Sequence, residues 1–187
     1  MANEVLIKVG AQISFADHAG DFAPAAANSL EQGTPTDVQL TTASVSDGAA
    51  RESAKVDLGA TRARRYSLVG AVEMAATPVT GDIIELYWCA SPDPTAGNGN
   101  PGYCTGADAA FTGSPATLPE AVAQLIFIGA FICSADATTT VQIQQIGVFS
   151  PPERYGSLVV KNEAGAAFHS DDVETHFVMN PIVDEVQ

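Results

Sequence analysis

Hydrophobic and polar residues alternate with a period of two in two neighbouring segments near the middle of the chain, residues 66–76 and 82–89. Both segments are rich in β-branched and aromatic residues, and the sequence between them, TPVTG at 77–81, carries a proline and a glycine. This pattern is typical of two half-buried strands joined by a tight turn. The sequence therefore predicts a central hairpin, which must pack against a second sheet because an isolated hairpin is only marginally stable.

A second pair of segments follows the same plan. Residues 126–134, IFIGAFICS, form an almost continuous apolar run whose length suits a doubly buried strand better than a helix. A turn at 135–138 separates this run from residues 139–149, where Val141 and Ile143 alternate with Gln142 and Gln144. We expect a second hairpin here.

The remaining pattern predicts several more short strands and one helix. Thr117 and Glu120 have the spacing of a capping box, which predicts a short helix over Leu118–Leu125. The further strands are expected at 5–9, 11–15, 38–42, 156–162 and 173–183. The glycines, prolines and asparagines of residues 92–115 predict a long loop, and loops of this length in compact domains are usually functional.

These elements predict an all-β protein, a jelly-roll-like antiparallel β-sandwich of about eight strands with one short helix and long loops. A chain of 187 residues fits a single domain. Within it we expect residues 1–58 to supply N-terminal strands and an extended arm, long enough to reach a neighbouring subunit. Residues 59–187 are expected to form the jelly-roll body.

Charge narrows the range of partners. The chain has 22 acidic and 8 basic residues and a net charge of −14. Nucleic acids and anionic membrane surfaces attract basic proteins, so neither is an expected partner. The N-terminal sequence does not resemble a signal peptide, and no apolar run approaches the roughly 20 residues that span a bilayer.

Five of the eight basic residues fall within a window of fifteen residues, and they are Arg51, Lys55, Arg62, Arg64 and Arg65. Such a run is often just a solvated face. The alternative is a docking surface, because a basic strip on an acidic protein can contact an acidic neighbour or another copy of the same chain.

The three cysteines, Cys89, Cys104 and Cys133, are odd in number and include no C-x-x-C motif. This argues against a disulfide framework and against a zinc knuckle. We expect small buried hydrophobic side chains in a reducing compartment. Pairing of Cys89 with Cys104 across one loop stays open as an alternative.

Two polar groups are candidates for metal ligation. Oxygen atoms of Asp93, Asn98, Asn100 and Asp108 in the long loop suit calcium, although their spacing matches no calcium-loop pattern. The sequence HSDD at 169–172 is followed by Glu174 and His176, whose alternation places a carboxylate and an imidazole on one strand face.

In both cases the simpler interpretation is a solvated polar segment, and the sequence predicts no cofactor. His18 has no evident partner.

Catalytic motifs are equally sparse. There is no G-x-S-x-G nucleophile motif and no P-loop. Glu73 and Glu85 could imitate a glycosidase carboxylate pair on the two central strands, but we expect both to be exposed. Tyr87, Trp88 and Tyr103 are candidate contact aromatics that could stack on sugar rings. For Trp88 we favour a place in the core beside Ile84 and Leu86, and the protein is not expected to be an enzyme.

Several short framework motifs between Gly59 and Gln187 resemble one group of structural proteins of tailed bacteriophages. These motifs are GATR at 59–62 before YS at 66–67, GD at 81–82 leading to LYW at 86–88, the loop from GN at 97–98 to GAD at 106–108, FSPP at 149–152 with RYG at 154–156, and FHSDD at 168–172 with PIVDE at 181–185. Residues 1–58 carry no matching motif. The resemblance implies a small virion protein with a jelly-roll-like body.

The resemblance also implies a role. We expect a non-enzymatic capsid decoration (cement) protein that stabilises the head through contacts with the major capsid protein or other virion proteins. Such proteins usually act as homo-oligomers, often trimers, and this one would be assembled into the virion in the host cytoplasm. The alternatives are a neck, tail or baseplate component and a carbohydrate-binding jelly roll that contacts the host surface.

Overall fold

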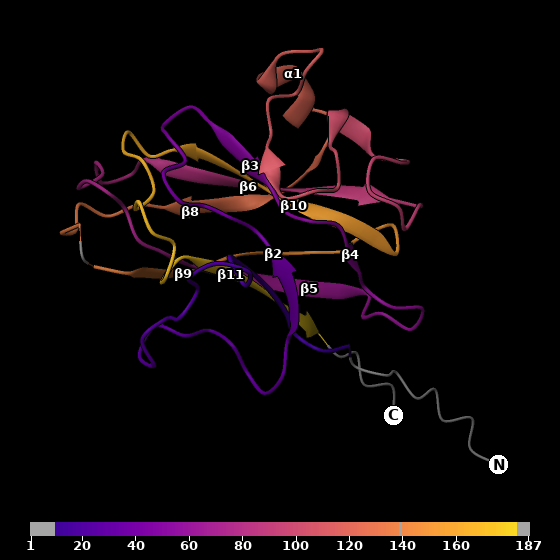
Figure 1. Cartoon of the computed structure of the whole chain (residues 1–187), viewed down its shortest axis with the longest axis horizontal. Helices are drawn as coiled ribbons and strands as arrows, with labels where there is room; N and C mark the ends of the chain where they lie inside the picture. The colour runs from indigo at the N-terminus through magenta and orange to yellow at the C-terminus, as the bar shows by residue number, and fades with distance from the viewer. Residues whose placement is uncertain (1–9, 139, 183–187) are drawn as a thin grey trace.

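Two β-sheets packed face to face make up the body of the protein in this computed structural model, which describes residues 10–138 and 140–182 (Figure 1). Short connections and a few longer loops join eleven strands and two short helical segments. In chain order the elements are β1 Ile13–Ala16, β2 Thr36–Gln39, β3 Ala50–Glu52, β4 Val56–Asp57, β5 Arg65–Val72, β6 Ile83–Ser91, the 3-10 turn η1 Pro101–Tyr103, β7 Ala109–Ala110, α1 Leu118–Val122, β8 Ile126–Ile132, β9 Gln142–Phe149, β10 Tyr155–Glu163 and β11 His176–Ile182.

The strand order confirms the predicted jelly-roll sandwich. One sheet, sheet A, has the order β2-β1-β11-β5-β9, and the other, sheet B, has the order β7-β3-β10-β6-β8. Setting aside the edge strands β2 and β7, and β4, which pairs with β10 off the main path, each sheet holds four antiparallel strands. Their order is that of two interleaved Greek keys.

Both expected hairpins are wrong, although the strands themselves are present. β5 lies in sheet A and β6 in sheet B, and β8 and β9 are likewise in different sheets. Each pair therefore crosses from one layer to the other instead of pairing within a layer. Period-two alternation shows that one face of a strand is buried, but the two sheets bury their inner faces in the same core, so the pattern cannot identify the neighbouring strand.

The edge formed by β8 and β9 is closed by a reciprocal backbone contact. A Cβ atom on Gly129 would lie 2.5 Å from the Ile146 carbonyl oxygen, and one on Gly147 would lie 2.6 Å from the Ile128 carbonyl oxygen. The strand registers shift where these two Ile-Gly pairs lie, between Leu86 and Tyr87 opposite β8 and between Leu68 and Val69 opposite β9. We refer to Ile128–Gly129 and Ile146–Gly147 together as the Ile-Gly contact.

Side chains of β9 extend this closure. The amide oxygen of Gln144 accepts a hydrogen bond from Ile132 N at 2.6 Å, and that of Gln142 accepts one from Ser134 N at 2.8 Å. Gln142 Nε2 also donates to the Ser134 carbonyl at 2.9 Å. Glutamines that looked like the outer face of a hairpin therefore satisfy the backbone of β8 in the other sheet.

Large side chains fill the space between the sheets. Trp88 on β6 is fully buried and packs against Phe149, with ring centroids 5.6 Å apart. Gly156 on β10 gives the indole room, since a Cβ there would lie 2.4 Å from two of its ring atoms. Trp88 thus belongs to the core, as the alternation with Ile84 and Leu86 favoured.

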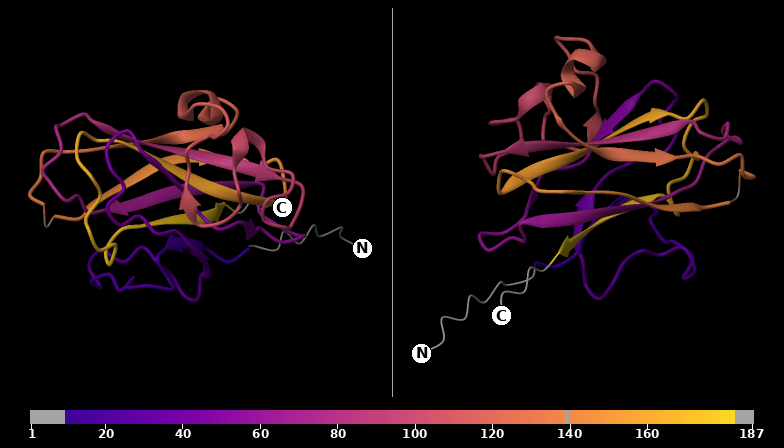
Figure 2. Two further views of the ribbon diagram at one scale, coloured as in Figure 1. Left: turned by 45° about the horizontal axis from the view of Figure 1, so that its top comes forward. Right: turned by 180° about the vertical axis from the view of Figure 1, so that it is seen from behind.

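The segment expected to be a reaching arm lies against its own body. β2 pairs in parallel with β1, while β3 and β4 pair with β10. The segment at 17–35 is held by hydrogen bonds from Ala25 N and Asn28 Nδ2 to the Glu174 carboxylate, both 3.0 Å. Figure 2 shows this indigo segment on the outer side of sheet A from two directions. The expected strand at 5–9 lies outside the described residues.

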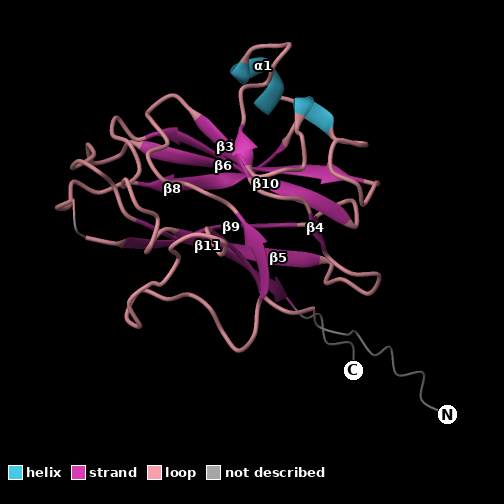
Figure 3. Ribbon diagram, viewed as in Figure 1, coloured by secondary structure: helices cyan, strands magenta, loops and turns pink. Residues whose placement is uncertain are grey.

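The long excursion between β6 and β8, residues 92–125, covers part of the outer face of sheet B (Figure 3). It is not structureless, because η1, β7 and α1 fall within it. The predicted capping box is confirmed: Thr117 and Glu120 bond reciprocally at the N-terminus of α1, which ends at Val122, earlier than expected. Between this excursion and sheet B lies a second, smaller core.

Candidate functional site

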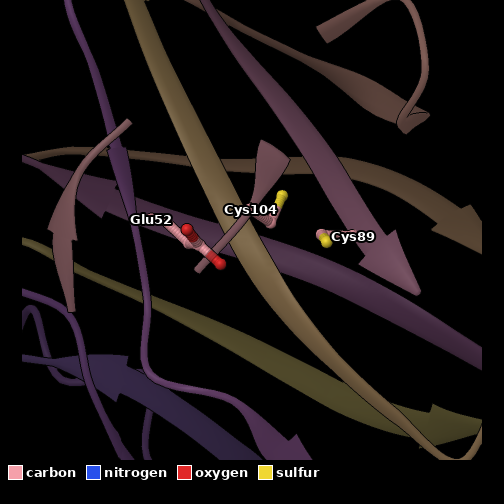
Figure 4. Close-up of side chains that lie close together, drawn as sticks. All are labelled: Glu52, Cys89 and Cys104. Atoms are coloured by element: carbon pink, nitrogen blue, oxygen red, sulfur yellow. The ribbon is translucent and has the colours of Figure 1, made fainter. Parts of the chain in front are cut away.

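The second core contains the most enclosed group of chemically reactive side chains in the described part of the chain. Glu52 on β3, Cys89 on β6 and Cys104 after η1 are all buried, and their carboxylate oxygen and sulfur atoms lie within 4.8 Å of one another (Figure 4). We refer to these three residues as the thiol–carboxylate cluster. Strand register builds it, because β10 pairs with both β3 and β6 and so holds Glu52 and Cys89 on either side of one strand.

The Glu52 carboxylate anchors the excursion. It accepts hydrogen bonds from Thr105 N at 2.8 Å, Thr105 Oγ1 at 3.1 Å and Gly106 N at 2.7 Å. Burial raises the pKa of Glu52, and these hydrogen bonds partly offset that rise by stabilising the ionised form. Three donors occupy three of the roughly four acceptor positions of a carboxylate, so one remains available.

All three cysteines are free and buried, as expected. The contact with Cys89 and burial raise the pKa of the Cys104 thiol, which is therefore protonated at neutral pH. Cys133 lies elsewhere, in the sandwich core, and burial followed by the charge of Asp82 raises its pKa to about 11.

In the long loop that was considered as a calcium site, the side chain of Lys55 lies among the loop's oxygen atoms. Lys55 Nζ donates to Ser91 Oγ at 2.9 Å and to the carbonyl oxygens of Asp93, Thr95 and Asn98 at 3.0, 2.8 and 2.9 Å. An ammonium group thus occupies the oxygen-lined position that the loop offers to a cation. Asp108, on the other side of the loop, is committed to Arg51 and Thr41.

The five clustered basic residues divide into two groups. Arg51 is ion-paired with Asp108 at 2.8 Å, and Lys55 holds the loop as described, so both have partners within the chain. Arg62 donates to the Pro152 carbonyl at 3.1 Å, and Arg64 and Arg65 are exposed near the start of β5. Docking of an acidic partner on these residues stays a prediction.

The polar cluster at 169–176 does not converge on one point. Asp172 is buried and accepts hydrogen bonds from Thr42 N at 2.6 Å and Ala43 N at 3.1 Å. His176 is also buried, and its Nε2 accepts from Leu30 N at 3.0 Å, while Glu174 binds the 17–35 segment. Burial lowers the pKa of His176 and keeps it neutral. These side chains hold the N-terminal segment in place.

His169 and Asp171 stay at the surface. Their Nδ1 and Oδ1 atoms are 3.1 Å apart, and Glu73 lies close to both. Burial acts to lower the pKa of His169, but the contacts with Asp171 and Glu73 outweigh it and raise that pKa. This is a partly exposed surface ion pair.

Glu73 lies just after β5 of sheet A and Glu85 lies within β6 of sheet B, so the two carboxylates considered as a glycosidase-like pair belong to different sheets. Both are half-buried, not exposed as expected. Glu85 instead accepts hydrogen bonds from Tyr87 Oη at 3.0 Å and Lys161 Nζ at 2.8 Å. His18, which had no evident partner, contacts the Ser14 carbonyl at 3.1 Å and packs edge-on against Phe22.

The three candidate contact aromatics differ in exposure. Trp88 is fully buried and Tyr87 is only 9% exposed, so neither ring is open to stack on an external ligand. Tyr103, at 46%, is exposed. Burial and, to a lesser degree, the hydrogen bond to Glu85 raise the pKa of Tyr87 to about 12, consistent with a structural hydroxyl.

Sequence reasoning missed an apolar surface on the β8–β9 edge. Phe127, Ile132, Ile143 and Val148 are each about half exposed, at 55, 55, 47 and 49%. At one end, Ile132 and Ile143 line a hollow of about 360 Å³ together with Gln142 and Gln144. Between Ile126 and Phe149 the only charged residue is Asp136. We call the four exposed residues the β8–β9 patch.

No family model matches the chain, and no curated protein is similar to it in sequence. Within residues 10–138 and 140–182, no helix is long and apolar enough to cross a membrane.

Proposed function

We propose that this chain is a non-enzymatic structural protein of a tailed-bacteriophage virion, which decorates and stabilises the capsid as a homo-oligomer. The single observation that carries the proposal is the β8–β9 patch. A protein of net charge −14 exposes four large apolar side chains on the two strands of this edge, and Asp136 is the only charged residue within residues 126–149. Exposed apolar surface of this kind marks interaction sites.

The occupant we infer for the patch is a second copy of the chain. Two copies that are both strongly acidic repel each other, and a nearly charge-free edge is where they can approach without desolvating like charges. Capsid attachment would then use other surfaces of the oligomer, among them the basic residues Arg62, Arg64 and Arg65.

The polar residues considered for metal binding or catalysis support a structural role. Asp172, Glu174 and His176 fix the N-terminal segment, and Glu85 is bound by Tyr87 and Lys161. Each has a defined partner within the fold. A sandwich in which the charged groups stabilise long loops suits repeated protein–protein contact.

The oligomeric state tests the proposal. Light scattering after size exclusion should give an oligomer for the wild type and a monomer for Ile143→Glu and Ile132→Glu, whose positions are exposed enough to accept a carboxylate without unfolding. Tyr103→Glu is the matched control, because it places the same charge at an exposed aromatic position in the excursion, and it should remain oligomeric. A monomeric wild type, or oligomers that survive both edge substitutions, would contradict the assignment.

Copy counting by mass spectrometry of purified particles tests the place on the virion. A decoration protein should be present at a copy number comparable to that of the major capsid protein. A few copies per particle would instead indicate a neck, tail or baseplate component.

A further inference from the structure

The thiol–carboxylate cluster has a fourth polar neighbour. Ser157 on β10 lies directly opposite Cys89 in the β6–β10 ladder, and its hydroxyl is close enough to Glu52 to help lower that residue's pKa. Ser157 is 1% exposed, yet its Oγ has no hydrogen-bonding partner among the described residues. Glu52 is thus its polar neighbour, and no hydrogen bond of ordinary geometry from the described part of the chain ties the hydroxyl down, so it can turn toward a ligand beside that carboxylate.

The four side chains come from four separate segments. β3 supplies Glu52, β6 supplies Cys89, β10 supplies Ser157, and the excursion supplies Cys104. Each is buried in the small core under η1 and α1, or beside it, so water has little access. The two sulfur atoms and a Glu52 oxygen therefore converge in an enclosed space, and the Ser157 hydroxyl adjoins Glu52 (Figure 4 shows Glu52, Cys89 and Cys104).

We propose that this cluster binds one thiophilic divalent cation of the zinc class. Cys89 Sγ, Cys104 Sγ and one Glu52 oxygen are its ligands, and the Ser157 hydroxyl takes the fourth position. Sulfur ligands select zinc over calcium or magnesium, and structural zinc sites are tetrahedral with four ligands. A tetrahedral site with ordinary zinc distances puts two sulfur ligands about 3.8 Å apart and a sulfur and an oxygen about 3.5 Å apart. The sulfur and carboxylate atoms lie within 4.8 Å of one another, so they need to approach by at most about 1.3 Å.

The carboxylate is already oriented for this role. Its hydrogen bonds from Thr105 and Gly106 hold both oxygens and leave one acceptor position free. Ligating carboxylates usually have such supporting donors, which fix their direction. The same hydrogen bonds tie the site to the excursion, so a bound cation would lock residues 92–125 onto sheet B.

Charge and atoms balance without any redox step. A divalent cation displaces one proton from each thiol, forming two metal–sulfur bonds and releasing two protons to solvent. Two thiolates and the Glu52 carboxylate carry −3, so the site with its cation has a net charge of −1. Because binding releases two protons, the affinity of the site for the cation should rise with pH.

Cobalt(II) titration of the reduced full-length protein tests the site directly. We expect saturation at one equivalent, a thiolate-to-cobalt charge-transfer band, release of about two protons and displacement of cobalt by zinc. Cys89→Ser and Cys104→Ser should each weaken binding by at least a hundredfold, and Glu52→Gln by about ten- to a hundredfold. Cys133→Ser is the matched control, being a buried thiol outside the cluster, and should bind like the wild type.

Wild-type protein alone can overturn the proposal, so it does not depend on how the variants fold. Absence of the charge-transfer band in reduced wild type would refute it. Binding that survives in Cys89→Ser, or that is lost only in Cys133→Ser, would place the cation elsewhere. Thiol counting also separates the rival outcome: if Cys89 and Cys104 are already joined as a disulfide in protein purified without reductant, the cluster is a covalent crosslink and not a cation site.

Discussion

Replacing Gly147 with alanine tests whether the Ile-Gly contact holds the two sheets together at the β8–β9 edge. The added Cβ would lie 2.6 Å from the Ile128 carbonyl oxygen, a backbone atom that cannot rotate away. Ordinary carbon-to-oxygen contacts between strands are about 3.3–3.6 Å. β9 must therefore move away from β8 by about 0.7–1.0 Å.

That displacement has a predictable cost. Overpacking by a methyl group usually destabilises a protein by about 1–3 kcal/mol, and here it also strains the hydrogen bonds from Ile132 N and Ser134 N to Gln144 and Gln142. In a domain of this size each kcal/mol lowers Tm by about 2–4 °C. We expect a loss near 2 kcal/mol and a Tm lower by about 4–8 °C.

Urea unfolding followed by tryptophan fluorescence measures the loss, since Trp88 is buried in the core between the sheets. Gly10→Ala is the matched control, because it has the same effect on the unfolded chain and its nearest heavy atom, Tyr66 Oη, is 3.9 Å away. Gly129→Ala should behave like Gly147→Ala, and the double variant should lose less than the sum because both push the same strands apart. Equal unfolding midpoints for Gly147→Ala and Gly10→Ala would show that the strands are not in contact.

Three further predictions concern the core, the excursion and the N-terminal segment. Trp88→Ala should cost about 3–5 kcal/mol in urea unfolding because the indole is fully buried; a variant with native stability would return Trp88 to the candidate contact aromatics. Lys55→Met removes the ammonium that binds three loop carbonyls, so hydrogen exchange at residues 92–98 should accelerate while that of β10 is unchanged; equal acceleration in both would contradict a local role. Burial lowers the pKa of His176 in the folded state below its value in the unfolded chain. Below about pH 6.5 the unfolded chain therefore binds a proton at His176 more readily than the native state does, and the free energy of unfolding should fall as the pH drops. His176→Gln should flatten this pH dependence of the urea midpoint, and an unchanged slope would mean that another group causes it.

The fold class could be predicted from the sequence because the alternation of apolar and polar residues shows, for each strand separately, that one of its faces is buried. Strand positions such as β10 and β11 follow from it with errors of a few residues. Strand partners do not, because pairing in a jelly roll is long-range: β5 pairs with β11 and β9, not with its neighbour in sequence β6. The prediction of a jelly roll and the prediction of two consecutive hairpins were in fact incompatible, since these crossovers join different sheets.

Short strands in polar sequence were also missed. β3 and β4 lie in a stretch that lacks the apolar alternation of a strand, and they form because β10 offers them a free edge. Tertiary pairing overrode weak local propensity there. Without β3, Glu52 could not be placed opposite β10.

The thiol–carboxylate cluster was only partly within reach of the sequence. Pairing of Cys89 with Cys104 was an open alternative, and the structure does bring their side chains together. Glu52 and Ser157 carried no local signal, because each becomes notable only through its register on β10. A site whose residues come from different strands cannot be recognised from the spacing of those residues along the chain.

The β8–β9 patch shows how charge can direct association on this molecule. Of the net charge of −14, Asp136 contributes −1 within residues 126–149, which leaves −13 on the rest of the chain. Contacts between two copies through the acidic parts of those other surfaces bring like charges together, which is unfavourable and suppresses wrong pairings. Contact through the patch avoids that cost and buries apolar surface. The Ile-Gly contact holds the two strands that carry the patch at a fixed separation, so the packing that closes the sandwich also fixes the shape of this apolar surface.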